Sequence, residues 1–152
     1  MSRLLSCEAY FLNYPRILEN ANLQKELFKE PSMRLLVDLW NRLELTFTGI
    51  GVMSEKSRLY HLSSEEMKKE IHAQDIQCDL NALFFDSKGN YVPLYERNKL
   101  AISKDLFFNV PTKVVIGYGR YKAAIDAALK SGAIDILFTD RETVNEIEKE
   151  RW

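Results

Sequence analysis

The hydrophobic positions of the chain form short apolar runs that alternate with segments of helical spacing. Apolar runs of strand length occur at 45–51 (LTFTGIG), 80–86 (LNALFFD) and 114–117 (VVIG). Before the first of these runs, the segment that starts at Pro31 predicts a helix, because its leucines and a tryptophan have the spacing of one helix face. Strands that alternate with helices predict an α/β fold: a Rossmann-like, largely parallel sheet with flanking helices.

Weaker patterns supply further elements. EAYFLNYP (8–15) predicts a strand that Pro15 ends, and NKLAIS (98–103) predicts another short strand. Helix starts are predicted at four capping residues: Asn22, Ser63, Ser103 and Asp140. No stretch has the composition of a linker, so we expect a single domain over residues 1–152.

Charge and composition narrow the classes of function. The 21 Lys and Arg against 22 Asp and Glu give a formal charge of −1, which excludes a general attraction to nucleic acid or acidic membranes. The cysteines and histidines lack metal-ligand spacing, so we expect neither a metal nor a cofactor. No apolar run reaches the roughly 18 residues of a membrane helix. We therefore expect a cytoplasmic protein that contacts no membrane.

The segment 114–140 (VVIGYGRYKAAIDAALKSGAIDILFTD) reads as strand, glycine turn, alanine-rich helix and strand. Ligands of such units bind at the turn from strand to helix. The dinucleotide fingerprint G-x-G-x-x-G is set aside, because Lys122 stands where the third glycine is needed. Gly117 and Gly119 let backbone amides face an anion, and Arg120 and Lys122 add positive charge. The turn is a candidate phosphate site; the alternative is that both cationic side chains extend into solvent.

The order of motifs along the chain resembles the C-terminal part of the sugar-binding domain of SorC/DeoR-type bacterial transcriptional regulators. TFTGIG is followed by CDLNALFFDSKGNYVP, by the glycine turn with its lysine, and by AAIDAAL and GAIDILFTD. YFLNYP and EPSMRLLVDLWNRLE fit as well, so the resemblance covers nearly the whole chain. The family's helix-turn-helix segment and its first phosphate-binding loop have no counterpart here. We therefore expect a truncated domain.

This resemblance implies a fold similar to that of sugar-phosphate isomerases and deaminases, with a sugar or phosphorylated sugar as the effector. Lys122 matches the family lysine that contacts the ligand's phosphate or acidic group, and Asp79 matches the acidic position that accepts hydrogen bonds from sugar hydroxyls. Gly49 and Gly51 match the glycine turn, and Arg58 matches a basic residue in the loop after it. Such domains sense a ligand and oligomerise; they are not enzymes, and only their helix-turn-helix segment contacts DNA.

Two other interpretations stay open at this point. A sugar-phosphate isomerase or deaminase would need a base beside a carbonyl group, and Asp79 or Asp86 would have to serve. A non-binding structural fragment would instead pair its open sheet edge with another copy of the chain. Asp79 by itself fits a residue that caps a loop equally well, and Asp86 fits the first position of the turn DSKGN.

Overall fold

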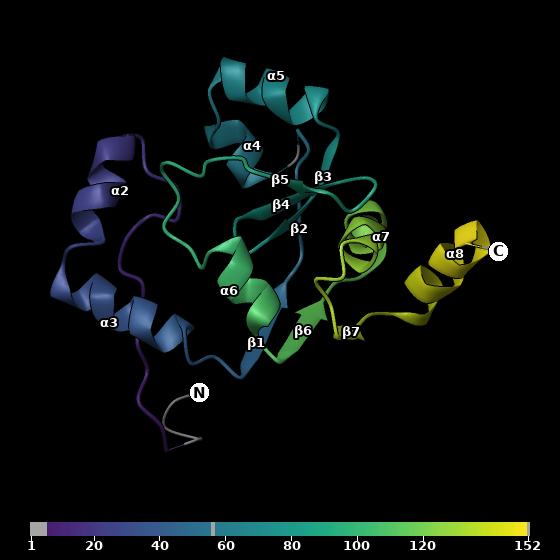
Figure 1. Cartoon of the computed structure of the whole chain (residues 1–152). Coiled ribbons are helices and arrows are strands. Elements are labelled where there is room, and N and C mark those ends of the chain that lie inside the picture. The colour runs from purple at the N-terminus through teal and green to yellow at the C-terminus, as the bar shows by residue number, and fades with distance from the viewer. Residues whose placement is uncertain (1–5, 56, 152) are drawn as a thin grey trace. The chain divides into compact units, whose positions relative to one another are not determined.

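The α/β class expected from the sequence is confirmed by the computed structural model, which describes residues 6–55 and 57–151, without the side chains of Arg120, Glu150 and Arg151. These residues divide into two units (Figure 1). The first unit takes the chain up to Arg42 together with Tyr95–Ile102. The second takes Leu43–Leu94 and the chain from Ser103 on, and it contains both β-sheets.

The first unit has a small apolar core around two helices. These are α2 (Ala21–Leu27) and α3 (Pro31–Trp40). Proline suits the first position of α3, because the N–H that proline lacks would have no hydrogen-bond acceptor within the helix at that position. Main-chain hydrogen bonds from Leu18 N to Asn98 O (2.7 Å) and from Leu100 N to Arg16 O (2.6 Å) tie its two chain segments together. The core consists of Leu18, Met33 and Leu100, with Leu12, Leu27, Phe28, Leu36 and Trp40 packed around them.

The predictions of strands over 8–15 and 98–103 are wrong. Residues 8–15 form no strand, and 98–103 contribute only an isolated antiparallel bridge between Ile17 and Lys99. Tyr10 and Phe11 are 48% and 71% exposed, so this aromatic run is not buried in a core. A strand needs a neighbour for its backbone hydrogen bonds, and the described part of the first unit places no strand beside residues 8–15.

The second unit contains a three-stranded parallel sheet in the order β1-β6-β7. Its strands are β1 (Leu45–Gly49), β6 (Thr112–Ile116) and β7 (Ile136–Phe138). Helix α6 (Lys104–Asn109) precedes β6, the short helix η1 (Gly119–Tyr121) and helix α7 (Lys122–Lys130) connect β6 to β7, and α8 (Arg141–Arg151) follows β7. The strand–helix–strand unit predicted over 114–140 is confirmed.

A four-stranded antiparallel sheet in the order β2-β3-β4-β5 belongs to the same unit, and the sequence did not predict it. Its strands are β2 (Gly51–Val52), β3 (Ile76–Leu80), β4 (Leu83–Asp86) and β5 (Tyr91–Val92); α4 (Arg58–Leu62) and α5 (Glu65–Ala73) lie between β2 and β3 in the chain. The single strand expected over 80–86 is interrupted by a tight turn at Asn81 and Ala82, whose φ angles are +53° and +63°. Hydrophobic periodicity does not reveal a turn inside an apolar run.

Helix starts follow the predicted residue types. The side chains of Ser103 and Asp140 accept hydrogen bonds from the first turns of α6 and α8, as predicted. Helix α5 is capped by Ser64 instead of Ser63, and α2 is capped by Asn20 instead of Asn22. In both cases the residue type is the same and the boundary moves by one or two residues, which is an ordinary error for a helix end defined from sequence.

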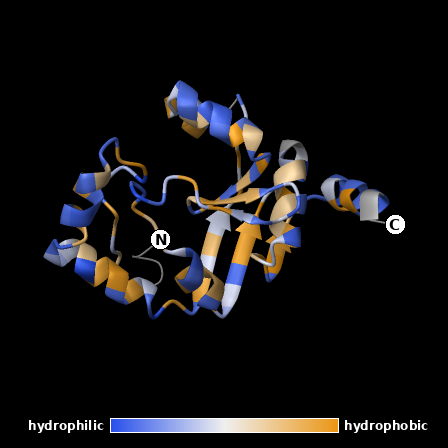
Figure 2. Ribbon diagram, turned by 45° about the horizontal axis from the view of Figure 1, so that its top comes forward, coloured by the Kyte–Doolittle hydropathy of each residue, from blue (hydrophilic) through white to orange (hydrophobic). Residues whose placement is uncertain are grey.

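The core of the second unit is aromatic and aliphatic. Phe84, Phe85 and Phe107 are at most 1% exposed. In Figure 2 the strands of the parallel sheet carry long hydrophobic stretches, whereas α5 and α8 mix hydrophilic and hydrophobic residues. None of the described helices has the length and apolar character needed to span a membrane. The core therefore combines the strands with α6, which supplies Phe107, and with α7, which supplies Ile125.

The turn between β4 and β5 packs against the end of α7, and this contact requires glycine at position 89. Gly89 has a φ of +84°, and a Cβ there would lie 2.6 Å from the carbonyl carbon of Lys130 and from the amide nitrogen of Ser131. We expect Gly89→Ala to lower the free energy of unfolding by about 2–4 kcal/mol, because backbone strain and overlap with main-chain atoms add. Gly132 is the matched control: it has a φ of +74° but open space around its Cβ position. Gly132→Ala should cost only about 1 kcal/mol in urea unfolding, and equal losses for both variants would contradict the packing argument.

A buried lysine at the start of β6 depends on Asp135. The ammonium of Lys113 lies 2.7 Å from Asp135 Oδ2 and also donates to the carbonyl of Val110, and its side chain is only 7% exposed. Hydrogen bonds from the side chain and the amide of Lys113 lower the pKa of Asp135. Because this pKa is lower when folded, the stabilisation is complete above the unfolded value near pH 4 and is lost as pH falls through the folded pKa.

We therefore expect Asp135→Asn to lower the free energy of unfolding at neutral pH by about 1–2 kcal/mol. The loss stays below the 3–5 kcal/mol of a fully buried pair, because Asp135 is 42% exposed and water screens it. The variant should also flatten the fall in stability below about pH 4. Glu148→Gln, at an exposed position of α8, is the control and should change neither quantity in urea unfolding followed against pH.

Candidate functional site

At the carboxyl ends of the three parallel strands, β1 and β6 are followed by turns that contain glycine, and β7 is followed by the start of α8. β1 ends at Gly49, β6 is followed directly by Gly117, and β7 leads to Thr139 and Asp140. The amide of Gly117 donates to the carbonyl of Phe138 (3.1 Å), so the three strand ends stay together. Ligands of α/β proteins bind beyond this edge of the sheet, and most of the residues singled out in the sequence lie there.

Gly117 serves close packing. A Cβ at this position would lie 2.5 Å from Cγ2 of Ile50 and 3.2 Å from Cγ1 of Ile125 on α7. The glycine thus lets the chain pass between β1 and α7 at the end of the sheet. A Cβ on Gly49 would meet nothing within 4 Å, so no such restriction applies there.

The amide of Gly119 is bound by the protein itself. It donates to Oδ2 of Asp140 (3.0 Å) and to the hydroxyl of Thr143 (2.7 Å), and its φ is +54°. Hydrogen bonds from the side chain and the amide of Thr143, and from the Gly119 amide, lower the pKa of Asp140. A carboxylate of the same chain thus occupies the position that the glycine pattern suggested for a ligand anion.

The next amides of the turn are also engaged. The amide of Tyr121 donates to the carbonyl of Tyr118 (3.3 Å), and the amide of Lys122 donates to the carbonyl of Gly119. The side chain of Arg120, which the sequence singled out, lies outside the described residues. Among the described side chains of this turn, Lys122 carries a positive charge.

Asp79 and Gly51 lie side by side in the antiparallel sheet. Gly51 of β2 pairs with Asp79 of β3, and a Cβ on Gly51 would lie 3.2 Å from Oδ2 of Asp79. Oδ1 of the same carboxylate accepts a hydrogen bond from the amide of Ala82 (2.8 Å). Asp79 therefore has the loop-capping role that the sequence left open. The hydroxyl of Thr48, at the end of β1, lies 3.3 Å from Oδ1 of Asn81 in the same turn.

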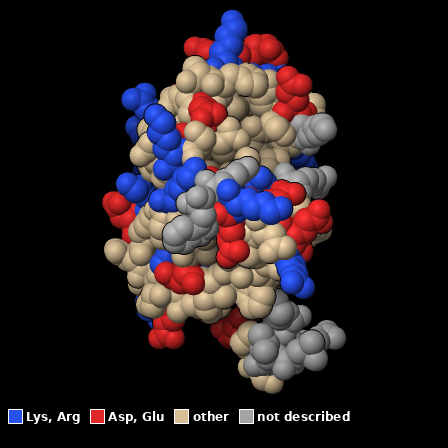
Figure 3. Space-filling model, turned by 90° about the vertical axis from the view of Figure 1, so that its right-hand side faces the viewer, with Lys and Arg blue, Asp and Glu red and all other residues tan. Residues whose placement is uncertain are grey.

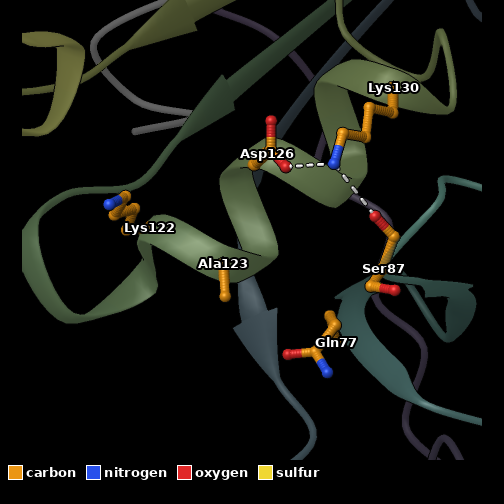
Figure 4. A pocket seen from close by; sticks show the side chains of 6 residues that line it. All are labelled: Gln77, Ser87, Lys122, Ala123, Asp126 and Lys130. Atoms are coloured by element: carbon orange, nitrogen blue, oxygen red, sulfur yellow. Dashed lines mark hydrogen bonds and ion pairs between the residues drawn. The ribbon is translucent and has the colours of Figure 1, made fainter. Parts of the chain in front are cut away.

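Lys122 lines a pocket of about 390 Å³ between α7 and the β3–β4 hairpin. The other lining residues are Gln77, Ser87, Ala123, Asp126 and Lys130 (Figure 4). Lys130 lies 2.5 Å from Oδ2 of Asp126 and donates to the carbonyl of Ser87 (3.2 Å). The side chain of Lys122 points away from this ion pair, is 30% exposed and lies 3.6 Å from Oε2 of Glu146 on α8. Its ammonium is therefore within reach of solvent beside the pocket.

The structure places the ligand-binding residues predicted from the sequence in more than one location. Gly49, Gly51 and Asp79 lie near the end of β1, and the turn with Gly117 and Gly119 leads into Lys122. Asp79 is not among the pocket-lining residues, and Arg58 is exposed at the first position of a different helix, α4. Figure 3 shows one face of the molecule, on which both signs of charge mix: lysines and arginines gather across the middle, with carboxylates around them.

Comparison with known proteins shows which family the chain belongs to. Residues 1–147 match a family model described as "Putative sugar-binding domain". The chain belongs to this family. A transcriptional regulator from Streptococcus pneumoniae TIGR4 superposes on the sugar-binding domain with a TM-score of 0.88 and 26% identity, over 99% of this chain and 59% of that one. No curated protein matches the chain at a significant level.

Two further solved structures share the fold of the sugar-binding domain. The full-length sorbitol operon regulator SorC from Klebsiella pneumoniae has a TM-score of 0.88 and 20% identity, over 96% of this chain and 49% of that one. A DeoR family transcriptional regulator from Listeria monocytogenes has a TM-score of 0.82 and 21% identity, over 93% and 59%. The resemblance to SorC/DeoR-type regulators is confirmed. The sugar-binding domain described here spans between 49% and 59% of these three chains.

Some polar residues of the pocket were not singled out in the sequence. Asp126 and Lys130 follow Lys122 at helical spacing, so the pattern of charges along α7 could have indicated these two. Gln77 and Ser87 carried no such signal, because their position depends on how the β3–β4 hairpin packs against α7. No three His, Cys, Asp or Glu side chains gather as metal ligands among the residues that the structure describes.

Two substitutions of Asp79 distinguish the contribution of its negative charge from that of its hydrogen bond to the Ala82 amide. Asp79→Ala removes the acceptor of the Ala82 amide and should lower the free energy of unfolding by about 1–2 kcal/mol. Asp79→Asn keeps an oxygen at Oδ1 and should lose clearly less in the same urea unfolding measurement. Equal losses would show that the negative charge, and not the hydrogen bond, holds the turn.

Proposed function

We propose that the chain is the effector-binding part of a sugar-responsive transcriptional regulator, and that it binds a sugar or phosphorylated sugar. Membership of the sugar-binding domain family over residues 1–147 supports this most directly. The match to a Streptococcus pneumoniae protein described as a transcriptional regulator supports the regulatory role. The sugar-binding domain spans 59% of that structure. In this proposal it binds the effector, and contact with DNA belongs to a helix-turn-helix segment.

The single geometric observation that carries the binding proposal is the position of Lys122. It stands at the first position of α7, directly after the turn that follows β6, and beside a pocket. Glu146 lies 3.6 Å from its ammonium, which is longer than a charge-assisted hydrogen bond. This ion pair is loose, and Lys122 is 30% exposed, so an incoming phosphate or carboxylate can compete with Glu146 for its ammonium.

Asp79 and Gly51 are proposed to receive the hydroxyl end of the ligand. Oδ1 of Asp79 holds the Ala82 amide, while Oδ2 faces the strand β2 next to Gly51. Each carboxylate oxygen can accept more than one hydrogen bond, so a carboxylate held in place by the protein can also accept from the hydroxyl groups of a sugar. Gly49, Gly117, Gly119 and the exposed Arg58 complete the proposed surroundings.

Ligand sensing is favoured over catalysis. The solved relatives reported above are described as transcriptional regulators, not as enzymes. Asp86, the other carboxylate considered as a base, is bound into the DSKGN turn: it accepts from the amides of Lys88 (2.9 Å) and Asn90 (2.8 Å) and from the side chain of Asn90 (2.9 Å). Burial works to raise its pKa, but these hydrogen bonds outweigh it and the pKa is lowered. A low pKa is the opposite of what a general base at neutral pH needs.

Thermal unfolding with added sugars tests the binding proposal. A panel of pentose and hexose phosphates, their unphosphorylated parents and inorganic phosphate should contain at least one compound that raises the melting temperature, because binding to the folded state stabilises it. In Lys122→Met the affinity for a phosphorylated ligand should fall by about 10–100-fold, the loss expected for one charge-assisted hydrogen bond.

Lys69→Met is the matched control, since Lys69 is an exposed lysine on α5. It should leave the affinity unchanged. If no compound shifts the wild-type protein, or if both lysine variants lose affinity equally, the proposed site is wrong. Turnover of a sugar phosphate that disappears in Asp79→Asn would instead favour the isomerase interpretation.

A further inference from the structure

The hairpin that joins β3 to β4 has a two-residue turn with a strained backbone. Leu80 pairs with Leu83, and the two residues between them, Asn81 and Ala82, both have a positive φ. Two positive φ angles are typical of a type I′ turn, which favours asparagine at its first position and glycine at its second. Alanine at position 82 is therefore strained. Strain of this kind persists where the surrounding structure imposes it, and it gathers at functional sites.

Contacts on both sides hold this turn at the carboxyl end of the parallel sheet. Oδ1 of Asp79 accepts a hydrogen bond from the amide of Ala82 (2.8 Å), and Ala82 is fully buried. On the other side, Oδ1 of Asn81 lies 3.3 Å from the hydroxyl of Thr48, the last residue but one of β1. Asn81 thus lies at the edge of the sheet where ligands of α/β proteins bind.

Half-buried polar residues of β3 lead from the pocket beside Lys122 to this turn. Gln77, Asp79 and Asn81 are half-buried, whereas Cys78 and Leu80 between them are fully buried. Gln77 lines the same pocket as Lys122. A polar row therefore begins at that pocket and ends at Asn81.

The side-chain amide of Asn81 differs from the other half-buried amides that the structure describes. Gln24 and Asn98 donate their side-chain nitrogens to main-chain carbonyls, and Gln77 donates to Asp75. Nδ2 of Asn81 has no acceptor among the described residues, and it is not one of the buried atoms that lack a partner. This N–H group is therefore open to a ligand at a position where polar groups normally find a partner.

We propose that Asn81 determines ligand specificity by donating a hydrogen bond to one hydroxyl oxygen of the effector, next to a hydroxyl that Asp79 binds. This inference rests on the proposed sugar-binding function. A hydroxyl group both donates and accepts, so a donor and an acceptor at a fixed separation match two neighbouring hydroxyls. Asp79 supplies the acceptor and Asn81 the donor, and the hydrogen bond from Asp79 to the turn fixes their separation. The ligand class is a sugar or sugar phosphate with adjacent hydroxyl groups.

The alternative is that Asn81 serves the turn alone, since asparagine tolerates a positive φ. Asn81→Gly separates the two roles, because glycine adopts this backbone without strain but has no donor. The variant should therefore keep a free energy of unfolding close to that of the wild-type chain in urea, and it should bind the ligand more weakly. A residue that serves only the turn would leave the affinity unchanged.

Titration calorimetry on the 152-residue chain tests the proposal. The probes are ribose 5-phosphate, glucose 6-phosphate, fructose 6-phosphate and the three unphosphorylated sugars, at least one of which should bind. Asn81→Gly should raise the Kd of each bound probe by about 2–10-fold, the loss of one hydrogen bond between uncharged groups. Asn81→Asp should weaken binding at least as much, because aspartate tolerates the positive φ and keeps an oxygen at Oδ1 but has no N–H.

Asn13→Gly is the matched control: it is the same substitution at an exposed position of the first unit, and it should leave the affinity unchanged. Equal losses in Asn13→Gly and Asn81→Gly would overturn the inference. If a probe binds the wild-type chain and either Asn81 variant equally well, Asn81 is not the donor and the proposed function stands. If no probe binds the wild-type chain, the proposed function is wrong and this inference falls with it.

Discussion

The second unit depends on a close approach at the end of its parallel sheet. Ile50 leaves β1, donates its amide to the carbonyl of Ile116 (3.1 Å) and is 8% exposed. One residue later the chain starts β2, so Ile50 joins the parallel sheet to the antiparallel one. Its side chain fits only because position 117 has no Cβ. A substitution there would separate β1 from α7, and with them the two groups of residues proposed to hold the ligand.

This constraint changes the meaning of the glycine-rich turn. From the sequence, Gly117 and Gly119 looked like residues that expose amides to an anion. In the structure Gly117 makes room for Ile50 and Ile125, and the amide of Gly119 donates to Asp140. The same sequence pattern serves tight packing and anion binding, since both need a backbone without side chains. Only the position of Asp140, which comes from the next strand, separates the two, and local sequence does not contain it.

The sequence predicted best where a local rule decides the structure. Helices α3, α5, α6 and α8 follow from apolar spacing and capping residues, and the unit from β6 to β7 follows from its glycines and alanines. Prediction from the sequence failed where the structure of a segment depends on contacts with residues outside it. Residues 8–15 have strand-like composition but no neighbouring strand, and the run 80–86 is broken by a turn that Asp79 holds from outside it. Lys122 could be identified from a motif, whereas Gln77 could be assigned to its pocket only from the packing of α7.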